Sequence, residues 1–285
     1  MAGIRPSRVL AFAAYEVRRA LARRKVLAVV AFTALLDTVP YFVLSTSGTK
    51  IIPARLFPYL WVAGLLAPFA LFIQFIAILI AAGAMSEEYE QGTVELILSK
   101  PVSRSEFFVG KFVGGYLLLF FIIVVNATLS IVSATVTYGQ QLALGIIPGT
   151  ILVEAYASLL FFSVAFMLGE LLRRSSLAYI MSAAFLVSSE IIGVYLSLAY
   201  DLTGKAIYQT VHAYLPTIVA GSLPSLYAEP LLPSGTSIIL GLIAGSGSGT
   251  LSLGQGSLLV ATYFVAAFSV AIVYFLSADV SRRVS

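Results

Sequence analysis

The sequence contains no cysteine, one histidine and one tryptophan. Without cysteine there can be no disulfide, thiolate metal site, iron–sulfur cluster or cysteine nucleophile. Charged residues are also scarce: they make up 11% of the 285 residues, whereas soluble domains carry roughly 25%. With 60% hydrophobic residues and a mean hydropathy of +1.00, the chain is predicted to be an integral membrane protein.

The apolar residues gather in stretches long enough to cross a hydrocarbon core of roughly 30 Å. We therefore expect an all-α protein in which residues 26–285 form one transmembrane domain. Its six predicted spans are 26–45, 60–84, 112–138, 150–172, 176–200 and 257–277. The outer loop 201–256 contains Thr236 to Ala244, which is too short to span and is either interfacial, re-entrant or part of an outer helix. Gly245 to Thr250 is predicted to be a flexible linker.

The positions of the basic residues predict the topology. Fourteen of the 17 Lys and Arg residues lie in the N-terminal arm, the 85–111 loop, the 173–175 turn and the C-terminal tail. Only Lys50, Arg55 and Lys205 lie in the alternate segments. Because cytoplasmic segments are rich in Lys and Arg, both termini and the 85–111 loop are predicted to be cytoplasmic, in the cell membrane. Since topology accounts for the net charge of +4, no nucleic-acid partner is expected.

Residues 1–25 are predicted to form an amphipathic helix on the cytoplasmic surface. Its apolar side would carry Leu10, Ala14, Val17 and Leu21, and its other side Arg8, Arg18, Arg19 and Arg23. A secretory signal peptide is the competing interpretation. The following apolar stretch is long for a signal peptide, and no clear small-residue cleavage site follows it.

The loop between the second and third spans carries signals for two helices. Glu87, Glu88 and Glu90 are expected to extend the second span into water, before Gly92 breaks it and Thr93 caps a short helix. An apolar stripe on that helix would pack on the membrane face or a partner: Val94, Ile97 and Leu98. Pro101 ends it, and Ser103 with Glu106 predicts a capping box that opens the third span. Three side chains are expected at the membrane interface: Phe107, Phe108 and Lys111.

These motifs resemble those of the ABC-2 type transporter permeases, in which Glu-x-Glu-x-Gly-Thr, Pro-x-Ser-Arg and Gly-Lys precede the third of six spans. The matching residues here, which the resemblance assigns to ATPase coupling, are Glu88, Glu90, Gly92, Thr93, Leu96, Leu98, Pro101, Ser103, Arg104, Gly110 and Lys111. Tyr89 departs from the pattern, since many relatives have arginine there. The alternative is a well-capped connecting loop, but a bare connection needs only a few residues.

The resemblance implies a permease that pairs with a second copy or a paralogue and docks ATP-binding subunits on the cytoplasmic side. The N-terminal arm would be the family's elbow helix, residues 86–99 would contact the ATPase, and transport would be export. This chain has no Gly-x-x-x-x-Gly-Lys-Ser/Thr loop, so it is not expected to be an enzyme itself. ATP and Mg²⁺ would bind the partner ATPase, and no cofactor or metal is expected on this chain.

Three acids lie within predicted spans: Asp37, Glu154 and Glu190. They would line a subunit interface or substrate route, lie near headgroups, or be protonated and bonded to a neighbouring helix. A proton-coupled secondary transporter that uses Glu154 and Glu190 is the alternative function, and a membrane enzyme or assembly factor is a third. His212 has no acidic neighbour in sequence, so an ordinary exposed or packed histidine is expected. Gly110, Gly114 and Gly115 would let another helix approach the third span closely, or reflect packing within one subunit.

Overall fold

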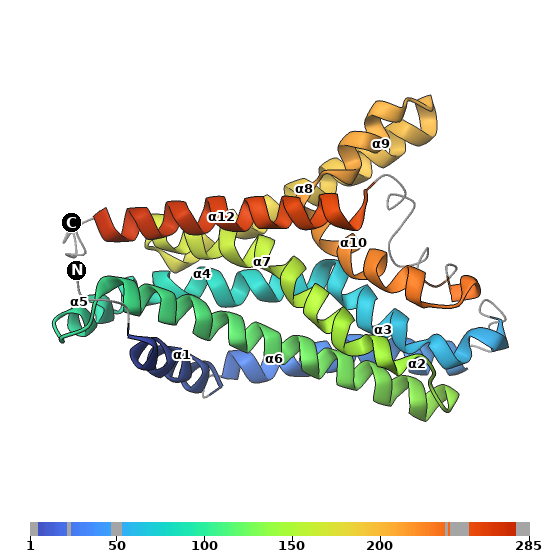
Figure 1. Ribbon diagram of the computed structural model, residues 1–285, viewed down its shortest axis with the longest axis horizontal. Coiled ribbons are helices and arrows are strands. Elements are labelled where there is room, and N and C mark those ends of the chain that lie inside the picture. The colour runs from blue at the N-terminus through green and yellow to red at the C-terminus, as the bar shows by residue number, and fades with distance from the viewer. Residues whose placement is uncertain (1–4, 22–23, 47–52, 237–238, 240–250, 278–285) are drawn as a thin grey trace.

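The computed structural model describes residues 5–21, 24–46, 53–236, 239 and 251–277, and no β-strand occurs among them. Long helices lie side by side in one elongated bundle (Figure 1). The α-helices are α1 (Pro6–Leu21), α2 (Arg24–Thr46), α3 (Trp61–Pro68), α4 (Gln74–Glu90), α5 (Thr93–Leu98), α6 (Arg104–Tyr138), α7 (Ile147–Leu172), α8 (Ser175–Thr203), α9 (Ala206–Ala213), α10 (Pro216–Ala228) and α12 (Leu253–Ser277). Shorter turns are η1 (Ala54–Tyr59), η2 (Phe69–Ile73), η3 (Leu144–Ile146), η4 (Glu229–Leu231) and η5 (Ser234–Thr236).

Five helical runs in the described part of the chain are long and apolar enough to cross a membrane, which confirms a multi-pass membrane protein. They are Leu71–Glu90, Arg104–Tyr138, Leu144–Leu172, Ser175–Thr203 and Leu253–Ser277. These runs correspond to the second through sixth expected spans. The first expected span falls on α2, whose apolar part, Ala28–Val43, is shorter, so the sixth crossing stays a prediction.

One widened turn interrupts the second span. The α3 helix ends at Pro68, the π-helical turn η2 follows, and α4 then continues to Glu90. Proline has no N–H group, so Pro68 cannot donate the hydrogen bond that an interior helical residue donates to the preceding turn. A π-helical turn is one way for a helix to accommodate a displaced hydrogen bond. Sequence reasoning placed one span at 60–84 and did not anticipate this turn.

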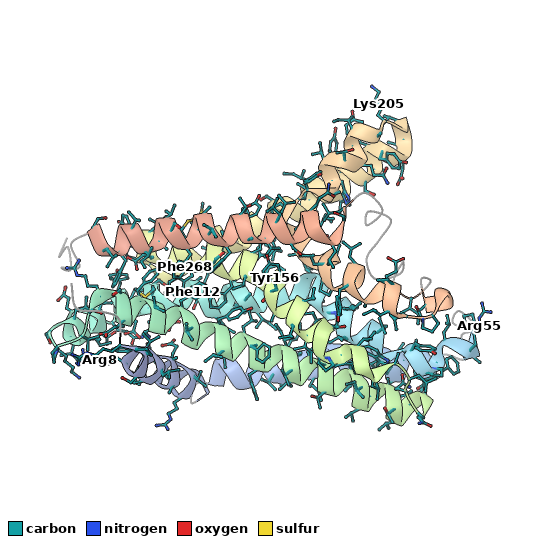
Figure 2. The ribbon with its side chains drawn as sticks, viewed as in Figure 1. Arg8, Arg55, Phe112, Tyr156, Lys205 and Phe268 are labelled. Atoms are coloured by element: carbon teal, nitrogen blue, oxygen red, sulfur yellow. The ribbon has the colours of Figure 1, made fainter. Side chains whose placement is uncertain are left out.

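The start of α1, the short helix α5 and the end of α12 lie at the same end of the bundle, which we call the loop end (Figure 1). Arg8 lies at this end, whereas Arg55 lies at the opposite end and Lys205 at the tip of a projecting hairpin (Figure 2). These three basic residues thus lie apart in the way that the sequence predicted. Which end faces the cytoplasm stays a prediction based on the excess of Lys and Arg at the loop end.

Small residues bring the helices into close contact. A Cβ atom added to Gly110 would lie 2.5 Å from Cβ of Phe12, and one added to Gly114 would lie 2.7 Å from Cβ of Glu16. Both contacts join α6 to α1. A Cβ atom on Gly169 of α7 would lie 2.5 Å from a backbone oxygen of α4. The predicted close approach therefore occurs within this chain, as one of the two interpretations proposed.

Packed aromatic rings hold α6, α7 and α12 together. Phe112 lies 5.0 Å from Phe268 between ring centroids (Figure 2), and Phe108 lies 5.2 Å from Phe166, both in edge-to-face geometry. Such pairs add roughly 0.5–1.5 kcal/mol beyond the burial of their area. The side chains of Phe107, Phe108 and Lys111 lie inside the bundle, since each is at most 1% exposed. Whether they lie at the depth of the membrane interface stays a prediction. No residue from Glu106 to Gly115 is exposed.

The segment after α8 forms a projecting hairpin and a helix that packs back on the bundle. The outer part of α8 and all of α9 point away from the other helices (Figure 1). The α10 helix returns against α7, where Val219, Ala220 and Leu223 are fully buried. The element of the outer loop that packs on the bundle is thus 216–228, which the sequence analysis did not single out. Thr236 to Ala244 and Gly245 to Thr250 lie almost entirely outside the described residues.

Candidate functional site

The α5 helix is placed by a sharp turn after the second span. Gly92 adopts φ +67° at the position before α5, a left-handed conformation that other residues adopt only at a cost. The prediction that Thr93 caps this helix is wrong: Gly92 occupies the cap, and Thr93 is the first helical residue. The Thr93 hydroxyl instead donates to the backbone oxygen (3.2 Å) and the carboxylate of Glu88, so it fastens the turn to α4.

The predicted apolar stripe of α5 packs on the bundle of this chain. Val94 is buried, and Ile97 and Leu98 are half-buried against the same core. Glu95 and Leu96 face outward, and Leu96 is 65% exposed. Of the apolar α5 side chains, Leu96 is the exposed one, so it offers another protein an apolar contact at the loop end.

A buried ion network lies directly behind α5. The Lys111 ammonium on α6 donates to Glu88 at the end of α4 (2.5 Å) and to Glu16 on α1. Arg19 of α1 also pairs with Glu88, and its guanidinium donates to the side chain of Gln91 (3.0 Å). Lys111 is 1% exposed and Glu88 2% exposed, so the expectation that Glu88 extends into water is wrong.

The sequence predicted Glu88 and Lys111 as members of one site, but it missed Glu16 and Arg19. A signal for Glu16 was present, because it is the only acidic residue in the basic 1–25 arm. Arg19 had been assigned to the polar side of α1 facing solvent. The structure turns Ala13 and Glu16 toward α6 and leaves Leu10 and Ala14 exposed, so the protein-facing side of α1 differs from the predicted apolar side.

The residues beside Glu88 each fasten α4 to a further helix. Glu87 accepts a hydrogen bond of 2.9 Å from the Tyr179 hydroxyl on α8. Glu90 accepts bonds of 2.8 Å and 2.6 Å from the backbone N–H and the hydroxyl of Ser175, at the first turn of α8. A carboxylate at this position also suits the positive end of the helix dipole. Glu90 is solvent-exposed, as the sequence predicted.

Tyr89 joins α4 to α7. Its hydroxyl donates a hydrogen bond of 2.7 Å to Glu170, which is fully buried, and the Arg173 guanidinium lies 4.7 Å from the centre of its ring. Arg173 also lies over the ring of Tyr274 on α12, at 5.4 Å. The position at which many relatives carry arginine is therefore occupied here by a phenol, with an arginine from the α7–α8 turn stacked on it. Glu170 lies in a predicted span, yet sequence reasoning did not single it out.

The exit of the loop is tied to the start of α1. Ser103 caps α6, and Glu106 completes the predicted capping box. Glu106 also accepts a bond of 2.9 Å from the backbone N–H of Arg5, and the Arg8 guanidinium donates to the backbone oxygen of Pro101 (2.6 Å). Arg104 is exposed and donates across to the backbone oxygen of Leu276 on α12, at 3.4 Å.

Comparison with known sequences shows the family of this chain. Residues 9–280 match the family model described as ABC-2 family transporter protein. The chain belongs to the ABC-2 transporter family. It is thus a multi-pass permease of the cell membrane, and this family comprises membrane components rather than ATPases.

One curated relative of this permease is the uncharacterized protein YhcI of Bacillus subtilis (strain 168). It is 26% identical over 164 residues, which are 51% of this chain and 52% of the relative. The chain therefore spans about half the length of the curated relative it matches.

The acids predicted inside the spans of the permease lie on three different helices. Asp37 lies on α2, and its side chain is outside the described part of the structure. Glu154 on α7 is fully buried, whereas Glu190 on α8 is half-buried. His212 of α9 has no acidic neighbour in the sequence, but in the folded chain Glu190 is close enough to act on it electrostatically. The expectation that no acid lies near His212 is therefore wrong. Burial lowers the pKa of His212, and the carboxylate of Glu190 opposes this shift.

No group of three or more His, Cys, Asp or Glu residues in the described part of the permease could hold a metal ion. The acids at the loop end are engaged by Lys, Arg, Tyr and Ser side chains from neighbouring helices. These contacts join the ends of helices that lie far apart in the sequence.

Proposed function

We propose that this permease is the transmembrane subunit of an ATP-driven exporter, with α5 as the coupling helix that a separate ATPase subunit contacts. Two permease chains, identical or paralogous, would pair in the assembly. The observation that carries the proposal is the placement of α5: its outer side exposes Leu96, and its inner side rests on helices tied together by buried ionic contacts.

The contacts of residues 87–90 support a route for force. A displacement of α5 would act on α4 through Gly92 and Thr93 and reach α6 and α1 through Glu88 and Lys111. It would reach α8 and α7 through the hydrogen bonds of the residues beside Glu88. A packed network of this kind moves as a unit because interiors are close-packed and deform little.

The sharpest test substitutes Leu96, because it is exposed and its loss leaves the buried network intact. We expect the purified wild-type chain to carry an ATPase subunit that has a phosphate-binding loop, and the complex to hydrolyse ATP. Leu96→Glu should lose most of that subunit and its ATPase activity while keeping the unfolding temperature of the wild type. Charge reversal of Glu88 is a poorer test, since it would disrupt folding first.

Leu144→Glu is the matched control, since Leu144 is 41% exposed and lies outside the loop that contains α5. This variant should retain both the ATPase subunit and its activity. Full retention of both by Leu96→Glu would overturn the docking role of α5. If export continued without ATP and stopped when the proton gradient was collapsed, the proton-coupled alternative through Glu154 and Glu190 would be favoured.

A further inference from the structure

A groove follows one side of α12, where this helix packs on α7 and, over part of its length, faces α8 across the groove. The half nearer the middle of the bundle, about 410 Å³, is lined by Met167 and Val164 of α7, Met181 and Phe185 of α8, and Tyr263 and Ala266 of α12. The half nearer the loop end, about 430 Å³, is lined by Leu171, Val273, Tyr274 and Ser277. Val270 lines both halves, so they adjoin.

The length of this groove matches one leaflet of a bilayer. From Tyr263 to Ser277 the α12 helix rises about 21 Å at 1.5 Å per residue. Half of a hydrocarbon core is about 15 Å, and the headgroup region adds several ångströms. The groove walls are apolar and open to the side, with Val273 62% exposed. An acyl chain of the leaflet at the loop end therefore fits the groove in both length and polarity.

The loop-end limit of the groove is basic. The Tyr274 ring, which lines it, lies 5.4 Å from the Arg173 guanidinium. Arg174 follows directly and is exposed, and it forms no ion pair within the described part of the chain. The carboxylate of Glu170 offsets Arg173 in part (3.9 Å), whereas neither half of the groove is lined by an acidic side chain. Glu90, which accepts hydrogen bonds from Ser175, is a second acid beside the two arginines, so the exposed guanidinium of Arg174 is the group left to meet a negative charge.

The geometry points to a specific lipid site: we propose that this groove binds one anionic phospholipid of the leaflet at the loop end. The acyl chains lie along Val270 and Ala266, and the phosphate lies against Arg174 with Arg173 beside it. Interfacial tyrosine and arginine side chains commonly contact headgroups at this depth. The proposal concerns a face of the bundle away from Leu96 and holds whether or not α5 docks an ATPase.

The test uses the purified full-length chain in non-ionic detergent, titrated with phosphatidylglycerol or with phosphatidylcholine of the same acyl chains. Native mass spectrometry counts the lipids bound per chain. We expect preference for phosphatidylglycerol at low salt. Arg174→Gln should weaken phosphatidylglycerol binding about five-fold and phosphatidylcholine binding less, because the choline cation already offsets the phosphate charge. Lys100→Gln removes an exposed charge at the loop end of the bundle, and it should change neither the affinity for phosphatidylglycerol nor that for phosphatidylcholine. Unfolding temperatures confirm that each variant is folded.

A second pair of variants tests the groove itself. Ala266→Phe fills it and should weaken the binding of both lipids, whereas Val265→Phe, on the neighbouring exposed position, should weaken neither. Equal effects of Arg174→Gln and Lys100→Gln would overturn the headgroup assignment. Equal effects of the two phenylalanine variants would overturn the groove assignment. A change in the number of chains per particle on Ala266→Phe, with lipid binding intact, would instead show that a second copy covers this face.

Discussion

The phenol of Tyr89 on α4 donates a hydrogen bond of 2.7 Å to Oε1 of Glu170, a fully buried carboxyl group on α7. Tyr89→Phe keeps the ring under Arg173 but removes this donor. A hydrogen bond to a charged group contributes about 1.5–3 kcal/mol, so we expect a comparable loss in the free energy of unfolding. Tyr195→Phe is the control, because Tyr195 is 66% exposed. Equal unfolding temperatures for the two variants would show that Tyr89 does not hold α7.

Removal of Lys111 should be more damaging. Lys111→Met leaves Glu88 and Glu16 facing each other in a buried site, with Arg19 as the remaining counter-charge. Breaking a buried ion pair by removing one partner costs about 3–5 kcal/mol. Thermal unfolding in detergent measures the loss, and Lys100→Met, at an exposed position, should stay within about 0.5 kcal/mol of the wild type.

The coupling between Lys111 and Glu88 can be isolated by a double-mutant cycle. If the two groups interact directly, Glu88→Gln combined with Lys111→Met should destabilise less than the sum of the single changes. Interaction free energies of about 0.5–3 kcal/mol are typical of residues in contact. Additive effects would contradict the direct pair that the geometry shows.

Gly114 should tolerate no side chain. A Cβ atom there would lie 2.7 Å from Cβ of Glu16 and 2.9 Å from the backbone of Ala13, and backbone cannot yield cheaply. Gly114→Ala is therefore expected to lose about 1–3 kcal/mol as α1 is pushed from α6. Gly145→Ala, where nothing lies within 4 Å, is the matched control and should be neutral or slightly stabilising. Unfolding temperatures of the two variants decide between these outcomes.

Because the chain lacks cysteine, single introduced cysteines report topology without a background signal. Leu96→Cys on α5 should react with a membrane-impermeant maleimide only after the cells are opened. Lys205→Cys, at the tip of the α8–α9 hairpin, should react in intact cells. Labelling of Leu96→Cys in intact cells would reverse the predicted orientation and remove α5 from the reach of a cytoplasmic ATPase.

His212 should make the region around α9 sensitive to acid. Burial lowers its pKa in the folded chain below the value of about 6.5 that it has when unfolded. The unfolded chain therefore binds the proton more readily, so stability present above pH 6.5 is lost as the pH falls below that value. His212→Asn should flatten this part of the profile of unfolding temperature against pH. An unchanged profile in the variant would assign the acid sensitivity to other groups.

The sequence predicted local features well and contacts between distant segments poorly. The capping box of Ser103 and Glu106 was found because two residues three positions apart suffice to define it. Five of the six predicted spans were found because apolar length is a local property. Whether Lys111 faces a membrane interface or a buried acid depends on α1, which lies some 90 residues earlier in the sequence, and hydropathy carries no such information.

The exposure of the charged side chains in the loop was also hard to predict from local sequence. A run such as Glu87 to Glu90 is usually solvated, so exposure was the natural prediction. Glu90 satisfies it, while Glu88 is buried because α1, α4 and α6 meet at its position. The family that the motif indicates is confirmed, but the side of the helix on which each member lies could be seen only in the assembled bundle.

The π-helical turn η2 is the position at which the second span can bend most easily. Bending a regular helix requires hydrogen bonds to be broken, whereas at η2 the regular pattern is already displaced. On the loop-end side of η2, hydrogen bonds of Glu87 through Glu90 hold α4 to its neighbouring helices. On the other side, α3 packs in a separate hydrophobic core around Trp61. A displacement of α5 would therefore change the angle between α3 and α4 at η2. The α3 helix, at the end of the bundle opposite the loop end, would tilt in consequence.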